Sequence, residues 1–292
     1  MRFRGLITAL ISPFKDGCFD EAGFIQNIHD QLAAGVSGLV VLGTTGESPT
    51  LSPLEQERAI TLALQTVAGR IPVIAGCGGN CTQTTIDKAI KCQRLGADAL
   101  ILITPYYNRP TQEGLYQHFA NIANAVDLPI MLYNNPVRTA VNLSIETLKR
   151  LSEIPNIVAI KDCSGSTTVI SEMLLICDEF SVLSGDDIMA FPTMALGCHG
   201  VVSTMGNLVP ERMVALVEAM QRGDLSTARA LHFELLPLFL ASGLETNPMP
   251  VKEMMRLSGK PAGSCRLPLC EVQPETRKKL QAVLEQITGC HR

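Results

Sequence analysis

The chain has 292 residues, of which 46% are hydrophobic and 18% are charged, and its formal net charge is −4. This composition allows a large core and excludes both intrinsic disorder and the broad basic surface that nucleic acid or an anionic membrane would require. No apolar run approaches the roughly 18 residues of a membrane span, and the N-terminal sequence lacks a signal-peptide core, so we expect a cytoplasmic protein.

Eight short apolar segments alternate with helical periodicity along most of the chain. They comprise residues 5–11, 38–42, 71–75, 97–103, 128–132, 157–160, 180–183 and 200–203. Continuously apolar segments are typical of parallel strands that are buried on both faces. Eight of them, with helices between, predict an α/β fold of the (β/α)8 TIM-barrel type. The alternative is a doubly wound open sheet, whose dinucleotide-binding form is disfavoured because no Gly-x-Gly-x-x-Gly follows the first segment.

The pattern changes after Pro210, where strand signals end and only helical periodicity remains. The helical stretches are residues 213–221, 226–240, 250–257 and 274–287. We assign the first of these to the last helix of the barrel. No low-complexity linker separates the remainder from it. The sequence therefore predicts a catalytic barrel at residues 1–223 and a C-terminal helical extension, packed on the barrel, at residues 224–292.

Lys161 directly follows the apolar segment 157–160 and precedes a turn-like Asp-Cys-Ser-Gly. A charged lysine at the end of a buried strand is costly, so it must reach water, pair with an acid or lose its proton. A neutral lysine amine is a nucleophile that can form a Schiff base with a ketone. A lysine that merely reaches water is the alternative, and this stretch alone does not exclude it.

Polar residues follow several of the other predicted strands, at the end where such barrels place their active sites. They are Thr44, Thr45, Tyr107, Tyr133 and Arg138. The Thr-Thr turn precedes a helix and can hold a carboxylate through N–H groups and hydroxyls, whereas the arginine can clamp a second carboxylate. A tyrosine hydroxyl near a reactive lysine can relay the protons of imine formation. Taken singly, each residue also fits an ordinary turn or a solvated loop.

Other conspicuous residues are expected to be structural. Asp186 and Asp187 have no evident third metal ligand, so we interpret them as cap or loop residues and expect no metal. His199 precedes the eighth strand, at the end of a barrel that serves stability. The ten cysteines include no Cys-x-x-Cys pair, and a cytosolic setting predicts reduced thiols.

Several motifs occur in order, each but the last at a predicted strand end. They are Gly-Thr-Thr-Gly-Glu (43–47), Thr-Pro-Tyr-Tyr (104–107), Tyr-Asn-x-Pro-x-Arg-Thr (133–139), Ile-Lys-Asp (160–162), Ser-Gly-Asp-Asp (184–187) and Asn-Pro-Met-Pro-Val-Lys (247–252). Together they make the chain resemble the 4-hydroxy-tetrahydrodipicolinate synthase family, formerly called dihydrodipicolinate synthases, which are class I aldolases that use pyruvate. The resemblance covers nearly the whole chain. It implies a condensation of pyruvate with L-aspartate 4-semialdehyde, the first committed step towards diaminopimelate and lysine.

The resemblance also implies catalytic roles. Lys161 would form the Schiff base with pyruvate, so neither a metal nor an organic cofactor is expected. Tyr133 would shuttle protons, and Thr44 would link it to Tyr107. In this family the tyrosine at the position of Tyr107 reaches into the site from a neighbouring subunit, within a homotetramer built as a dimer of dimers.

Substrate-binding roles are implied in the same way. Thr45 would hold the pyruvate carboxylate, and Arg138 would receive the carboxylate of the aldehyde. Gly185 and Val202 would lie near the pyruvate and line the pocket through their backbone carbonyls.

Members of the family that are inhibited by L-lysine have an allosteric site between subunits. Three residues match positions of that site, namely Ser48, Asn80 and Tyr106. Pro53, Gln56 and Thr84 stand where the inhibited enzymes have histidine, histidine and glutamate. Because threonine at the last position removes a carboxylate that would pair with the lysine ammonium, we expect weak or absent feedback inhibition.

Three alternatives remain. An N-acetylneuraminate lyase or a 2-keto-3-deoxy sugar-acid aldolase would share the lysine and the Thr-Thr turn, but Tyr107 and Arg138 favour the synthase. A non-catalytic binding or scaffold protein is disfavoured because the catalytic set is complete. A flavin- or phosphate-binding barrel would need a glycine-rich cradle after the last two strands, where Asp186 and Asp187 would repel phosphate.

Overall fold

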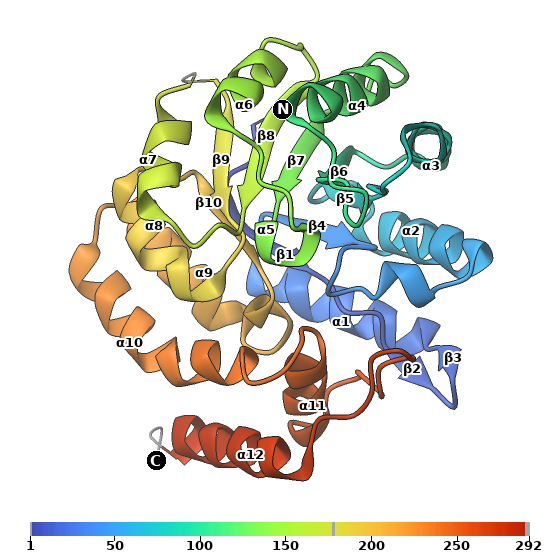
Figure 1. The fold of residues 1–292 in the computed structure, drawn as a ribbon. Coiled ribbons are helices and arrows are strands. Elements are labelled where there is room, and N and C mark those ends of the chain that lie inside the picture. Colours follow the sequence, from blue (N-terminus) through green and yellow to red (C-terminus); the bar gives the residue numbers. More distant parts are fainter. Residues whose placement is uncertain (1, 177–178, 290–292) are drawn as a thin grey trace.

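Eight parallel strands close into a barrel in the computed structural model, which describes residues 2–176 and 179–289 (Figure 1). The strands are β1 (Gly5–Ala9), β4 (Gly38–Val41), β5 (Val73–Gly76), β6 (Ala99–Ile103), β7 (Ile130–Asn134), β8 (Ile157–Asp162), β9 (Ser181–Ser184) and β10 (Gly200–Ser203). Each strand pairs with its neighbours in sequence, and β1 closes the ring by pairing with both β10 and β4. The predicted (β/α)8 architecture is confirmed.

Helices cover the outside of the barrel, one after nearly every strand (Figure 1). They are α1 (Glu21–Ala34), α2 (Pro53–Val67), α3 (Thr82–Leu95), α4 (Gln112–Asn124), α6 (Ile145–Ser152), α7 (Thr167–Leu174), α8 (Ala190–Leu196) and α9 (Pro210–Gln221). The start of α2 shows how local sequence sets an element. Ser52 accepts from the backbone N–H of Glu55, and the Glu55 carboxylate accepts from that of Ser52. This reciprocal cap fixes the end of the turn that carries the two threonines.

A separate apolar cluster fills the inside of the barrel. Its members include Ile7, Val40, Ile74, Met131 and Val202, all of them almost fully buried. The strand face that carries them alternates with the face that packs against the helices. This plug closes the barrel interior below Tyr133, so that a pocket can open only above it, at the carboxyl ends of the strands.

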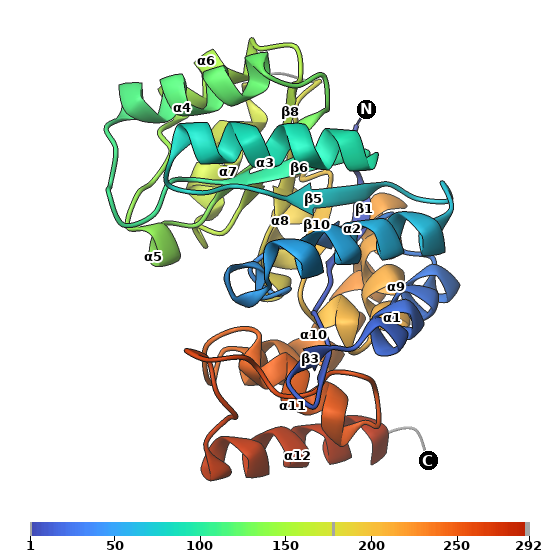
Figure 2. The same ribbon diagram turned by 90° about the vertical axis from the view of Figure 1, so that its right-hand side faces the viewer.

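Three further helices follow the barrel, namely α10 (Leu225–Ser242), α11 (Met249–Leu257) and α12 (Pro274–Gly289). Figure 2 shows α11 and α12 together at one end of the molecule, beyond α1 and next to the hairpin of β2 (Phe14–Lys15) and β3 (Cys18–Phe19). A buried ion pair joins this region to the barrel, because the Lys252 amine lies 2.7 Å from the Glu47 carboxylate. None of the helices within residues 2–176 and 179–289 has the length and apolar character that crossing a bilayer requires.

Several short elements had no counterpart in the sequence prediction. They are the hairpin β2 (Phe14–Lys15) and β3 (Cys18–Phe19), the 3-10 turns η1 (Ser48–Thr50), η2 (Asp187–Met189) and η3 (Met205–Asn207), and the single-turn helix α5 (Pro136–Thr139). Elements of two to four residues are too short to produce a hydrophobic period. Most of them lie between a strand and the following helix, where they shape the loops of the site.

Candidate active site

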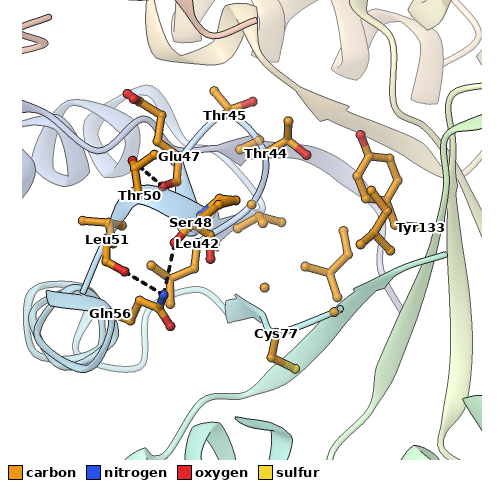
Figure 3. A pocket seen from close by; sticks show the side chains of 18 of the residues that line it. Leu42, Thr44, Thr45, Glu47, Ser48, Thr50, Leu51, Gln56, Cys77 and Tyr133 are labelled. Carbon is orange, nitrogen blue, oxygen red and sulfur yellow. Dashed lines mark hydrogen bonds between the residues drawn. The ribbon is translucent and has the colours of Figure 1, made fainter. Parts of the chain in front are cut away.

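A pocket of about 640 Å³ opens at the carboxyl ends of the strands. Its lining includes Thr44, Thr45, Tyr133, Arg138 and Lys161, which come from the ends of three strands, β4, β7 and β8. Figure 3 shows Tyr133 at one side of this pocket and Leu51 with Gln56 at the other, with the two threonines above. The structure therefore brings together five residues that the sequence analysis singled out separately.

Lys161 is the penultimate residue of β8, and its side chain is only 7% exposed. The amine lies 4.4 Å from the centre of the Tyr133 ring on the neighbouring strand β7, where the two residues are directly paired in register. Within the part of the chain that the structure describes, no carboxylate forms an ion pair with this amine. The adjacent Asp162 carboxylate is instead held by Asn134 and Ser164. Lys161 thus neither reaches bulk water nor pairs with an acid.

Gly185 makes the room that the Lys161 side chain occupies. A Cβ atom at this glycine would lie 2.6 Å from Cε and 2.8 Å from Cγ of the lysine, and 2.3 Å from Cys163 Sγ. The glycine N–H is tied to the Asp162 carbonyl at 2.8 Å, so the backbone cannot easily withdraw. Val202 lies fully buried in the adjoining strand β10, within the barrel plug. Neither Gly185 nor Val202 is among the residues that line the pocket.

The Tyr133 hydroxyl has a partner that the sequence analysis did not identify. The Asn135 side-chain amide donates to it at 2.9 Å, and the Cys163 thiol approaches to 4.0 Å. Burial raises the pKa of the Tyr133 phenol above its ordinary value, an effect that the charge of Lys161 opposes. Burial also raises the pKa of the Cys163 thiol to about 11, so this thiol stays protonated at neutral pH.

The Thr-Thr turn carries Thr44 towards the phenol and Thr45 towards the C-terminal region. Figure 3 shows the Thr44 hydroxyl on the side of the turn that faces Tyr133, although no hydrogen bond joins the two among the residues described. Thr45 is buried, and its hydroxyl accepts from the Asn247 amide at 3.0 Å. Glu47 is the last residue of this turn, and its backbone adopts the left-handed conformation with φ of 51°.

Asn247 connects the two groups that were predicted to bind carboxylates. Its amide donates to Thr45, and its backbone carbonyl accepts from Arg138 at 3.2 Å. The arginine lies on the single-turn helix α5, exposed at the rim of the pocket. A hydroxyl at the base and a guanidinium at the rim can therefore receive two separate anionic groups of bound substrates.

Tyr107 is not brought to the pocket of its own chain. Its side chain is 91% exposed, and its backbone adopts φ of 74°, which is unusual for a residue other than glycine. Tyr106 and Ser48 do line the pocket, as do Pro53 and Gln56. Asn80 and Thr84 do not line it; the Asn80 carbonyl accepts from Asn108, and the Thr84 hydroxyl donates to the Cys81 carbonyl.

The residues that were interpreted as structural have structural contacts. Asp186 caps η2, and the buried Asp187 accepts from Ser203 and from two backbone N–H groups at the start of η3. His199 accepts from the backbone N–H of Val182 at 3.1 Å. The eight cysteines of the described residues are free thiols, and no group of three potential metal ligands occurs among those residues.

Comparison with known proteins gives a consistent family. The model of the Dihydrodipicolinate synthetase family matches residues 2–287. The 4-hydroxy-tetrahydrodipicolinate synthase of Methanocaldococcus jannaschii is 46% identical over 98% of this chain and 99% of its own. The structure of dihydrodipicolinate synthase from Aquifex aeolicus superposes with a TM-score of 0.96 at 43% identity, covering 98% of both chains. The chloride-inhibited synthase of Acinetobacter baumannii, complexed with pyruvate, gives a TM-score of 0.95 at 38% identity over 98% of this chain and 99% of its own.

Proposed function

Because this chain belongs to the dihydrodipicolinate synthetase family, we propose that it condenses pyruvate with L-aspartate 4-semialdehyde to give 4-hydroxy-tetrahydrodipicolinate. It is a lyase of the diaminopimelate and lysine pathway. Its small-molecule substrates are both carboxylates, in agreement with a pocket that has a threonine turn at its base and an arginine at its rim.

In the proposed reaction the neutral Lys161 amine attacks the ketone carbon of pyruvate, and the resulting carbinolamine loses water to form an imine. Loss of a proton from the methyl carbon gives an enamine, which attacks the aldehyde carbon of the second substrate. The amino group of that substrate then attacks the imine carbon, which closes the ring and releases Lys161. No metal or organic cofactor takes part, because the protonated imine itself accepts the electron pair.

The observation that carries this proposal is the position of the Lys161 amine, which is buried, has no acid partner among the described residues and lies 4.4 Å from the centre of the Tyr133 ring. Protons must leave the amine and reach the departing water, and we assign both transfers to the Tyr133 hydroxyl. We propose that Thr44 continues this relay to Tyr107. Since Tyr107 is exposed in its own chain, it would complete the site of another subunit.

The remaining proposed contacts concern the substrates. Thr45 and the adjacent backbone hold the pyruvate carboxylate, and Arg138 holds that of the aldehyde. The backbones of Gly185 and Val202 border the pyruvate. The Acinetobacter structure in complex with pyruvate supports the assignment of the first substrate.

Borohydride trapping tests the nucleophile. Reduction in the presence of pyruvate should add one reduced pyruvate to the wild type, and peptide mapping should place it on Lys161. Lys161→Met should remain unmodified. Lys88→Met is the matched control, because Lys88 also lines the pocket but lies on α3, away from Tyr133. Irreversible labelling of Lys161→Met would show that another lysine is the nucleophile.

A coupled assay tests the substrate. The proposal expects turnover with L-aspartate 4-semialdehyde and none with sialic acid or 2-keto-3-deoxy sugar acids. Efficient cleavage of a sugar acid would instead support the aldolase alternative.

Regulation and assembly complete the proposal. We propose that L-lysine inhibits this enzyme weakly or not at all, although Ser48, Asn80 and Tyr106 match the lysine site of inhibited relatives, since Thr84 supplies no carboxylate. Half-maximal inhibition at sub-millimolar lysine would contradict this. We further propose a cytoplasmic homotetramer built as a dimer of dimers, which sedimentation at several protein concentrations would test.

A further inference from the structure

Asn135 is the residue between β7 and α5, and its side chain makes two hydrogen bonds in opposite directions. The side-chain oxygen accepts from the backbone N–H of Arg138 at 3.2 Å, which makes Asn135 the N-cap of α5. The side-chain nitrogen donates to the Tyr133 hydroxyl at 2.9 Å. Asn135 is 8% exposed, so neither contact is exchanged readily for water.

The capping contact determines which way the amide points. The Arg138 N–H also bonds to the Asn135 backbone carbonyl at 3.1 Å, but of the two side-chain atoms only the amide oxygen can accept from it, and this arrangement places the NH₂ group against Tyr133. An NH₂ group can only donate, and the phenol oxygen is therefore the acceptor in this bond. The phenol proton must then point away from Asn135; the other groups near the phenol are the Cys163 thiol, 4.0 Å from the hydroxyl, and the Lys161 amine, 4.4 Å from the ring centre.

We propose that Asn135 is a positioning residue, which turns the Tyr133 proton away from α5 and ties this phenol to the helix that carries Arg138. This inference rests on the proposed function of Lys161 and Tyr133. One amide thereby links the proton relay to the element that receives the second substrate.

The groups that face the phenol define what a pH profile can report. They are Lys161 on β8, Cys163 in the following loop, Arg138 on α5 and Asn135 itself. Burial raises the pKa of Cys163 to about 11, so this thiol stays protonated near neutral pH. Removing the bond from Asn135 withdraws a donor that stabilises the phenolate, and the pKa of Tyr133 should rise further.

Three substitutions of Asn135 distinguish a role in positioning Tyr133 from a role as the N-cap of α5 alone. Asn135→Ser and Asn135→Asp both retain a good N-cap acceptor for α5, whereas Asn135→Val removes it. Serine is too short to reach Tyr133, and aspartate reverses the bond by accepting the phenol proton. We expect kcat to fall about fivefold in Asn135→Ser, the equivalent of one neutral hydrogen bond, and further in Asn135→Asp. The KM for the aldehyde should stay unchanged in both and rise in Asn135→Val.

Two further readouts complete the test. The alkaline limb of the pH–rate profile should move to higher pH in Asn135→Ser, and the rate of pyruvate trapping by borohydride should fall with kcat. Ser144→Ala is the matched control, because Ser144 caps α6 in the same way but has no contact with the site. It should lower the melting temperature without changing kcat or the pH profile.

The proposal is overturned if Asn135→Asp keeps the kcat and pH profile of the wild type. It is also overturned if all three variants lose kcat only in proportion to their melting temperature, since Asn135 would then be a structural cap alone. A wild type that traps pyruvate but does not use the aldehyde would contradict the proposed function instead. The trapping rates of the variants would still test Asn135 in that case.

Discussion

The buried ion pair between Lys252 and Glu47 provides the sharpest test of how the C-terminal region supports the site. The Lys252 side chain is 2% exposed and that of Glu47 is 1% exposed. The amine donates to the carboxylate at 2.7 Å and to the Ser12 and Ser264 carbonyls at 3.0 and 3.1 Å. The second carboxylate oxygen accepts from the Arg266 backbone N–H. The Lys252 amine thus donates three hydrogen bonds, one for each of its protons.

Lys252→Met removes the positive charge but leaves the Glu47 carboxylate buried. Breaking one side of a buried ion pair costs about 3–5 kcal/mol, which is a large share of the roughly 5–15 kcal/mol that stabilises a folded protein. For a chain of this size we expect a fall in melting temperature of about 10 °C. Burial lowers the pKa of Lys252 and Glu47 opposes this, which agrees with a charge that depends on its partner.

The double variant Lys252→Met with Glu47→Gln decides whether the loss comes from the unpaired charge. Glutamine still accepts from the Arg266 N–H, so the double variant should recover most of the stability that Lys252→Met loses. Melting temperatures and urea unfolding would measure this recovery. Arg58→Met is the matched control, since the Arg58–Glu21 pair has the same 2.7 Å length but is exposed, and its loss should hardly change the melting temperature.

Strict additivity of the two single substitutions would refute this reasoning, because residues that share one buried pair must show a coupling free energy. Glu47 also lies two residues after Thr45, so Lys252→Met should slow pyruvate imine formation more than Arg58→Met does at a temperature where both are folded.

Three more predictions follow from single residues. Gly185→Ala should abolish borohydride trapping while the protein still folds, because the new Cβ would occupy the space of the Lys161 side chain; trapping at the wild-type rate would contradict this. Arg138→Ala should leave pyruvate trapping largely intact and raise the KM for the aldehyde at least tenfold, about 1.4 kcal/mol; equal loss of both half-reactions would refute that division. Burial lowers the pKa of His118 to about 4, so below the ordinary value of 6.5 the unfolded chain binds a proton that the folded chain does not. Stability should fall as pH drops from 6.5 to 4, by about 3 kcal/mol at most, and His118→Gln should lose less melting temperature between pH 7 and pH 5 than the wild type.

The barrel could be predicted from the sequence because its information is local. Each strand is an apolar run of four to six residues, and the strand ends are followed by turn residues that carry the polar side chains. Once the runs are counted, barrel geometry alone places Lys161, Tyr133 and Thr45 around one pocket. That inference required no knowledge of individual side-chain contacts.

The contacts within the site depend on information that a linear pattern does not contain. Asn134 and Asn135 are neighbours of the same type, yet one holds Asp162 and Asn142, and the other holds the Tyr133 phenol and caps α5. Their alternation across the end of β7 sends them to different sides, and only the atomic arrangement shows which one meets the phenol. Gly185 likewise gives no sequence signal that its missing Cβ makes room for Lys161.

The two buried lysines, Lys161 and Lys252, differ in the groups that surround their amines. Both lie in apolar stretches of sequence and both are almost fully buried, at 7% for Lys161 and 2% for Lys252. Lys252 has a carboxylate and two carbonyls around its amine, and the carboxylate opposes the lowering of its pKa by burial. The Lys161 amine lies against the Tyr133 ring and borders the pocket, with no acid partner among the described residues. Burial alone therefore does not distinguish the two lysines; the lack of an acid partner among the described residues does, and it separates the amine that we propose to react from the one that holds the C-terminal region.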